Sequence, residues 1–177
     1  MVTTSSTSEA ISVWGDFNTT GNGGSFLAEI SGNGQFVAYE TDSTNLLFSV
    51  NDNNNSTDII LGKSESTFEA EGYVSINSSG VLAQGGSSLW PEITYTGDQV
   101  VFDSSATNLA HNGITDGTRH VYINDRVVPL GDGSTRMCTV LLSQNGAGVH
   151  GNGDSERASV SANGRFVAFQ SVATNLI

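Results

Sequence analysis

A segment of more than twenty residues occurs three times in this chain, and the copies align without internal gaps. Successive copies lie 63 residues apart from Ile30 to Ile93 and 67 residues apart from Ile93 to Val160. Four columns hold the same kind of residue in every copy: Ile30/Ile93/Val160, Gly34/Gly97/Gly164, Tyr39/Phe102/Phe169 and Asn45/Asn108/Asn175. An internal repeat of this length indicates a fold assembled from similar units in succession.

Each copy predicts a β-hairpin. A short strand at 29–31 leads into a tight turn that ends at Gly34, where glycine permits a positive φ. The strand that follows, 36–39, is apolar at nearly every position, which is typical of a strand covered on both faces. Two further strands are expected per unit, at 58–61 and 72–76 in the first and at 120–123 and 139–143 in the second, and residues 10–14 align with the last of them.

Four antiparallel strands in a unit of about 65 residues predict an all-β fold made of β-propeller blades. Propellers close with about four to eight blades, and this chain has length for fewer than three. We therefore expect an incomplete propeller, a fragment of a longer protein, and the alternative is a ring that several copies complete. The cut blade edges are then a hazard for self-association. A β-solenoid is the structural alternative. The expected single partial domain, 1–177, divides into the last strand of a preceding blade (1–22), two blades (23–85 and 86–152) and the first half of a further blade (153–177).

The charge of the chain excludes several classes of partner. Eighteen acidic residues against six basic ones give a net charge of −12, and the basic residues are scattered singly. A nucleic-acid or anionic-membrane partner would require clustered Lys and Arg, so neither is expected. No apolar run approaches the length of a membrane span, about 18 residues. Cations and neutral polar ligands stay open as partners. The single cysteine, Cys138, is expected to be a buried structural thiol.

The sharpest candidate site is the acidic loop that contains Asp52, Asn54 and Asp58. Oxygen-bearing side chains at alternating positions, followed by a further carboxylate, suit a hard cation such as Ca²⁺. The alternative is that the loop forms Asx-turns, in which the same side chains satisfy backbone groups without any metal. In the second copy this pattern is reduced to Asp116.

No motif predicts catalysis, and the chain is expected not to be an enzyme. The sequence contains no Gly-x-Ser-x-Gly, no His-Glu-x-x-His and no phosphate-binding loop. His111, His120 and His150 lack ligand-like spacing, so zinc is not expected. The Thr-Asn-Leu triplet that ends each copy is expected to be architectural, with Asn bonding a turn and Leu packing between units.

The segment Ser161–Leu176, Ser-x-x-Gly-Arg-Phe-Val-Ala-Phe-x-Ser-x-Ala-Thr-Asn-Leu, resembles the TolB-like (WD-like) β-propeller repeat of bacterial secreted and periplasmic proteins. Residues 51–60 are similar to the stretch that follows in that family, and residues 113–122 are a degraded form of it. The resemblance implies a propeller and an extracellular or periplasmic location, although the chain itself has no signal peptide.

The expected function is that of a non-catalytic binding or scaffold module in an exported bacterial protein, which presents loops to a protein or glycan partner. The alternative is an accessory propeller of a secreted hydrolase, either a peptidase or a polysaccharide-active enzyme, whose catalytic module lies outside this chain. Fold alone does not decide between them.

Overall fold

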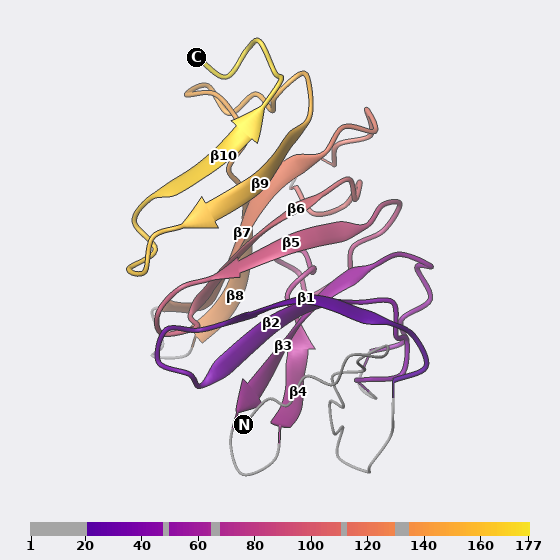
Figure 1. Ribbon diagram of the computed structural model, residues 1–177. Helices are drawn as coiled ribbons and strands as arrows, with labels where there is room; N and C mark the ends of the chain where they lie inside the picture. The colour runs from indigo at the N-terminus through magenta and orange to yellow at the C-terminus, as the bar shows by residue number, and fades with distance from the viewer. Residues whose placement is uncertain (1–20, 48–49, 65–67, 111–112, 130–134) are drawn as a thin grey trace.

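The computed structural model describes residues 21–47, 50–64, 68–110, 113–129 and 135–177, which form ten antiparallel strands in three sheets (Figure 1). The predicted all-β class is confirmed. Helices are absent from the described ranges, so no helix there is able to cross a membrane. The first sheet contains β1 (Ser25–Ile30), β2 (Phe36–Thr41), β3 (Asp58–Ser64) and β4 (Phe68–Tyr73); the second contains β5 (Ser88–Ile93), β6 (Gln99–Ser104), β7 (His120–Pro129) and β8 (Thr135–Leu141); β9 (Ser155–Val160) and β10 (Val167–Ser171) form a hairpin.

The two sheets and the hairpin are stacked in chain order, as Figure 1 shows from indigo through pink to yellow. Within each four-stranded sheet the strands are hydrogen-bonded in sequence order. The first strand of each sheet packs on the sheet before it: β5 contacts β1, β2 and β3, and β9 contacts β5, β6 and β7. The strands of the three sheets lie within the predicted ranges 23–85, 86–152 and 153–177, whereas residues 10–14 lie outside the described residues.

The second strand of each four-stranded sheet is buried on both faces, as its apolar sequence predicts. Val100, Val101 and Phe102 of β6 have no exposed surface, and alternate side chains enter different clusters. Val100 and Phe102 join the core between the two sheets, whereas Val101 packs with Ala158 of β9. Burying one such apolar side chain contributes about 1.5–3 kcal/mol, so these contacts fix how the sheets stack.

The fourth strands lie earlier in the chain than the sequence indicated. The prediction placed them at 72–76 and 139–143, but the structure has β4 at Phe68–Tyr73 and β8 at Thr135–Leu141. Both are edge strands with a partner on one side, so they tolerate polar residues that do not signal a strand. For the same reason the prediction of a buried Cys138 is wrong: the thiol is half-buried and its neighbour Met137 is exposed.

The Thr-Asn-Leu triplets have the expected architectural role. Asn108 Nδ2 donates to the Leu82 carbonyl at 2.8 Å, and Asn175 Nδ2 donates to the His150 carbonyl at 2.9 Å. Leu109 is buried in the core between the two sheets. Each Asn thus ties the loop that precedes its sheet to the end of its second strand.

Candidate functional site

The first strand of each sheet contains a β-bulge at the same position. The bulge residues are Leu27 in β1, Trp90 in β5 and Arg157 in β9, with φ angles of 39°, 56° and 53°. A positive φ is uncommon for residues that carry a side chain and costs about 1–3 kcal/mol at each position. Because three sheets share this conformation, the bulge is a repeated feature that the surrounding contacts must stabilise.

An acidic side chain on the preceding sheet faces two of these bulges. Glu40 Oε1 in β2 accepts a hydrogen bond of 2.7 Å from the backbone N–H of Trp90. Asp103 occupies the equivalent position in β6, where the backbone N–H of Arg157 stabilises its charged form. Asp103 is buried and also pairs with Arg119 Nη1 at 3.2 Å. Glu40 therefore holds the bulge of the second sheet by a hydrogen bond, and Asp103 lies beside the bulge of the third as its electrostatic counterpart.

Burial dominates the electrostatics of both carboxyl groups. Desolvation raises the pKa of Glu40, and the hydrogen bond from the Trp90 backbone opposes that rise. Desolvation likewise raises the pKa of Asp103 to about 6, although Arg119 favours the charged form. The hydrogen bond from Trp90 and the ion pair with Arg119 thus partly offset the cost of removing these carboxylates from water.

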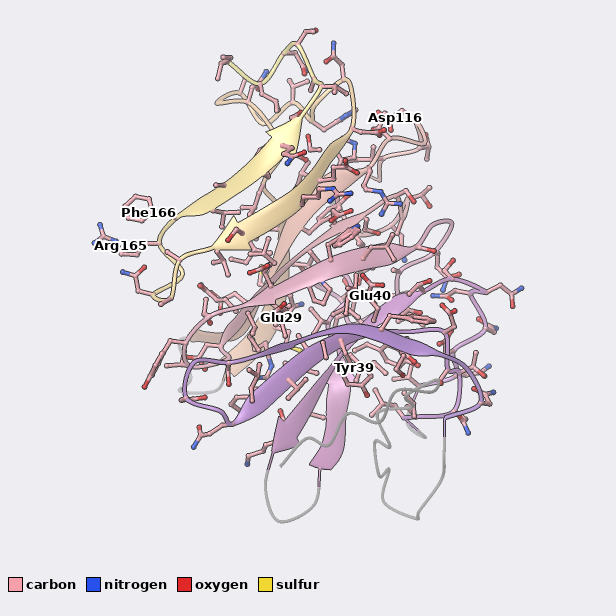
Figure 2. All side chains as sticks on the ribbon, viewed as in Figure 1. Glu29, Tyr39, Glu40, Asp116, Arg165 and Phe166 are labelled. Carbon is pink, nitrogen blue, oxygen red and sulfur yellow. The ribbon has the colours of Figure 1, made fainter. Side chains whose placement is uncertain are left out.

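A second repeated contact joins the start of the second strand to the turn of the next sheet. A Cβ on Gly97 would overlap the ring of Phe36, and a Cβ on Gly164 would overlap the side chain of Gln99. Phe166 occupies the same position in the hairpin, but 68% of it is exposed. Figure 2 shows Phe166 projecting from the β9–β10 turn into solvent. The start of β10 therefore exposes to solvent the position through which β2 and β6 contact the turn of the next sheet.

The structure brings the predicted calcium ligands Asp52, Asn54 and Asp58 together at the start of β3. Asn54 Nδ2 donates to Asp58 Oδ2 at 2.8 Å, and the Asn54 backbone N–H donates to Asp52 Oδ1 at 3.4 Å. Asn54 Oδ1 accepts a hydrogen bond of 2.9 Å from the backbone of Ser56. That last bond is the Asx-turn of the alternative interpretation.

The other two carboxylate oxygens of this loop also accept hydrogen bonds. Tyr73 OH donates to Asp52 Oδ2 at 3.1 Å, and Ser75 Oγ donates to Asp58 Oδ1 at 2.7 Å. Burial raises the pKa of Asp58 to about 6, against the stabilising hydrogen bonds from Ser75 and Asn54. All four carboxylate oxygens therefore have protein donors, which orders the loop without requiring a cation. Calcium at these residues stays a prediction of the sequence alone, and the hydrogen bonds favour the Asx-turn alternative.

The second sheet builds the same loop with different chemistry. The backbone N–H of Thr118 donates to Asp116 Oδ1 at 2.9 Å, as Ser56 does to Asn54 in the first sheet. Ser143 Oγ accepts a hydrogen bond of 3.1 Å from a β7 backbone N–H, the role that Ser75 has toward β3. His120 stands where Asp58 stands, with its Nδ1 3.1 Å from Ser143 Oγ. Asn–Asp–Ser in one sheet thus becomes Asp–His–Ser in the next.

A third side chain completes a cluster that the sequence did not predict. His150 Nδ1 lies 3.5 Å from Asp116 Oδ2, and the rings of His120 and His150 are 5.4 Å apart. Desolvation lowers the pKa of His120, although Asp116 opposes the shift. His150 lies 30 positions after His120, and the β7–β8 hairpin between them brings the two rings together. Linear spacing carried no signal for this arrangement.

A groove of about 640 Å³ lies between the β5–β6 turn and the β9–β10 turn. Its aromatic member, Tyr95, is 55% exposed. An exposed ring surrounded by amide and carboxylate groups is suited to neutral polar ligands. The lining residues are Thr94, Tyr95, Thr96, Asp98, Gln99, Asp125, Ala162 and Asn163.

The chain matches no protein-family model, no curated protein and no solved structure. The resemblance to TolB-like repeats therefore stays a prediction from the residues that carry it.

Proposed function

We propose that the chain is a non-catalytic scaffold module of β-propeller blades from an exported bacterial protein, which presents loops to a protein or glycan partner. The observation that supports this proposal is the repetition of one docking contact. Glu40 bonds the bulge of the following sheet, Asp103 occupies the same column beside the bulge at Arg157, and Gln170 occupies it in β10, where it is exposed. Each sheet is a blade, and β10 presents the docking face for another.

The complementary face lies on β1. Phe26, Leu27 and Ile30 are each about half exposed, and Leu27 has the bulge conformation of Trp90 and Arg157. A blade with these residues fits the β10 face as β5 and β9 fit theirs. Two copies of the chain would therefore associate head to tail, β1 on β10, through a heterologous interface.

Sedimentation velocity across a wide concentration range tests this docking. We expect the wild-type protein to show concentration-dependent association, because apolar area and the bulge contact are both buried. Phe166→Asp places a charge in the interface and should abolish the association. Val81→Asp is the matched control, because Val81 is an exposed apolar residue on the loop between β4 and β5. A wild type that stays monomeric, or an equal effect of both variants, would contradict the proposal.

The buried position of the Ser143 hydroxyl supports a non-catalytic role. Ser143, His120 and Asp116 form a chain of contacts similar in composition to a hydrolase triad. Ser143 has no exposed surface, and its Oγ accepts a backbone hydrogen bond. A nucleophile must reach its substrate, so this serine is better suited to holding the β7–β8 sheet end together.

The groove at Tyr95 favours the glycan form of the proposal. Calorimetric titration of neutral oligosaccharides tests it, with Tyr95→Ala expected to remove the stacking surface and the binding. Retained binding in Tyr95→Ala would place the glycan elsewhere, and no binding by the wild type would leave a protein as the partner.

A further inference from the structure

We propose that Asp116, His120 and His150 form a binding site for a divalent transition-metal ion, with zinc as the ion that best fits this donor set. The three residues come from the loop before β7, the first residue of β7 and the loop after β8. One ligand atom from each lies within 4.8 Å of the other two. Two imidazole nitrogens and a carboxylate are zinc ligands, whereas Ca²⁺ and Mg²⁺ prefer oxygen donors alone.

The separations of Asp116 from each histidine are close to those of a tetrahedral site. Zinc bonds of about 2.0–2.1 Å place neighbouring ligand atoms about 3.4 Å apart. His150 Nδ1 is 3.5 Å from Asp116 Oδ2, and His120 Nε2 is 3.8 Å from Asp116 Oδ1. One ion on all three residues requires the side chains to move closer together, and His150 Nδ1 to exchange its 3.1 Å contact with the Gly151 carbonyl for the metal. The fourth position then faces solvent, because Asp116 and His150 keep about a third or more of their side-chain surface exposed.

His120 is oriented for this role by its other nitrogen. The ring is buried, and its Nδ1 contacts Ser143 Oγ at 3.1 Å. Metal-binding histidines usually engage a second group through the nitrogen that does not bind the metal, which fixes the ring orientation. Here that contact directs Nε2 toward Asp116.

The Thr118 hydroxyl lies between two of the proposed ligands. Its Oγ1 lies 2.6 Å from Asp116 Oδ1 and 2.6 Å from His120 Nε2, so its hydroxyl bridges two of the proposed ligands. Binding requires this hydroxyl to move aside. Removal of the hydroxyl therefore leaves all three proposed ligands in place.

The first sheet closes the equivalent position with other residues. There Asn54 donates directly to Asp58, and buried Leu82 occupies the position of His150. In the first sheet, hydrogen bonds and an apolar side chain therefore fill this position. The second sheet instead directs three metal-ligating side chains at one another on the same scaffold.

Isothermal titration of metal-stripped protein with Zn²⁺ tests the proposal, and Co²⁺ absorption reports the coordination geometry. We expect one ion per chain with a tetrahedral Co²⁺ spectrum. His150→Ala and Asp116→Asn should each weaken Zn²⁺ binding at least about tenfold, since even outer-shell changes cost about 10–100-fold. Both residues are at the surface, and circular dichroism verifies that the variants remain folded.

Two control variants make the result specific. Asp98→Asn removes an exposed carboxylate from the β5–β6 turn, at the other end of β6 from His120, and should bind as the wild type does. Thr118→Ala should bind at least as tightly as the wild type. The proposal is overturned if the wild type does not bind stoichiometrically, or if His150→Ala and Asp116→Asn bind as tightly as Asp98→Asn.

Discussion

Glu40 accepts a 2.7 Å hydrogen bond from the backbone N–H of Trp90, and this contact joins β2 of the first sheet to the bulge of the second. The bond stabilises an unfavourable backbone conformation, because Trp90 has a positive φ of 56°. The stability of the stacked sheets should therefore depend on side chains that face across each junction.

Replacement of Glu40 tests this dependence. Glu40→Ala leaves the part-buried Trp90 N–H without its acceptor and should lower the free energy of unfolding by about 1–3 kcal/mol. Glu40→Gln keeps an acceptor oxygen and should recover most of that loss. Urea denaturation measures both variants. Equal stability of Glu40→Ala and wild type would show that the contact does not hold the junction.

Two turn glycines offer a matched comparison. Gly34 and Gly97 have φ angles of +72° and +81°, so alanine is strained at either position by about 1–2 kcal/mol. A Cβ at Gly34 meets nothing within 4 Å, whereas one at Gly97 overlaps the Phe36 ring. Gly97→Ala should therefore be the more destabilising by a further ~1–3 kcal/mol in thermal or urea unfolding. Similar losses for both variants would mean that Phe36 does not pack on the turn in solution.

Asp103 should make stability depend on pH. Its pKa is raised from the ordinary 3.8 to about 6 by burial, so the folded state holds a proton that the unfolded state releases between these values. The protonated Asp103 therefore stabilises the folded state fully below pH 3.8, and this stabilisation is lost as the pH rises toward 6. The free energy of unfolding should fall by up to about 1.4 kcal/mol per pH unit in this range. Urea unfolding of wild type and Asp103→Asn across this range isolates the effect. Parallel curves would contradict it.

The loop at Asp52, Asn54 and Asp58 gives a decisive metal test. Because all four carboxylate oxygens already accept protein hydrogen bonds, we expect millimolar Ca²⁺ to leave the thermal midpoint of metal-stripped protein unchanged relative to Mg²⁺. An ion that binds the folded state alone must raise the midpoint. A calcium-selective rise that disappears in Asp52→Asn would instead establish the calcium site that the sequence predicts.

The inner strands and tight turns could be predicted because their causes are local. The apolar run at 36–39 needs cover on both faces, and Gly34 supplies the positive φ that its turn requires. The last strands were misplaced because edge strands carry little apolar pattern. Ser75, predicted inside a strand, lies after β4, where its hydroxyl accepts a backbone hydrogen bond from β3.

The sites could be predicted only where their residues are close in the chain. Asp52, Asn54 and Asp58 were found together because one loop carries them. His120 and His150 were missed because their meeting depends on the β7–β8 hairpin and on the hydrogen bonds that close it. The bulge contacts were missed for a similar reason, since no local pattern marks Leu27, Trp90 and Arg157 as equivalent in backbone conformation.

Backbone amide exchange, followed by nuclear magnetic resonance at low and high protein concentration, tests the central claim most directly. Within each chain the amide of Trp90 is held by Glu40 and that of Arg157 faces Asp103. If the sheets dock through one repeated contact, both amides exchange slowly at every concentration. The amide of Leu27 should exchange quickly in dilute protein and slow down as β1 docks on β10 of a second copy. A Leu27 amide whose exchange does not change while the protein associates would contradict the account.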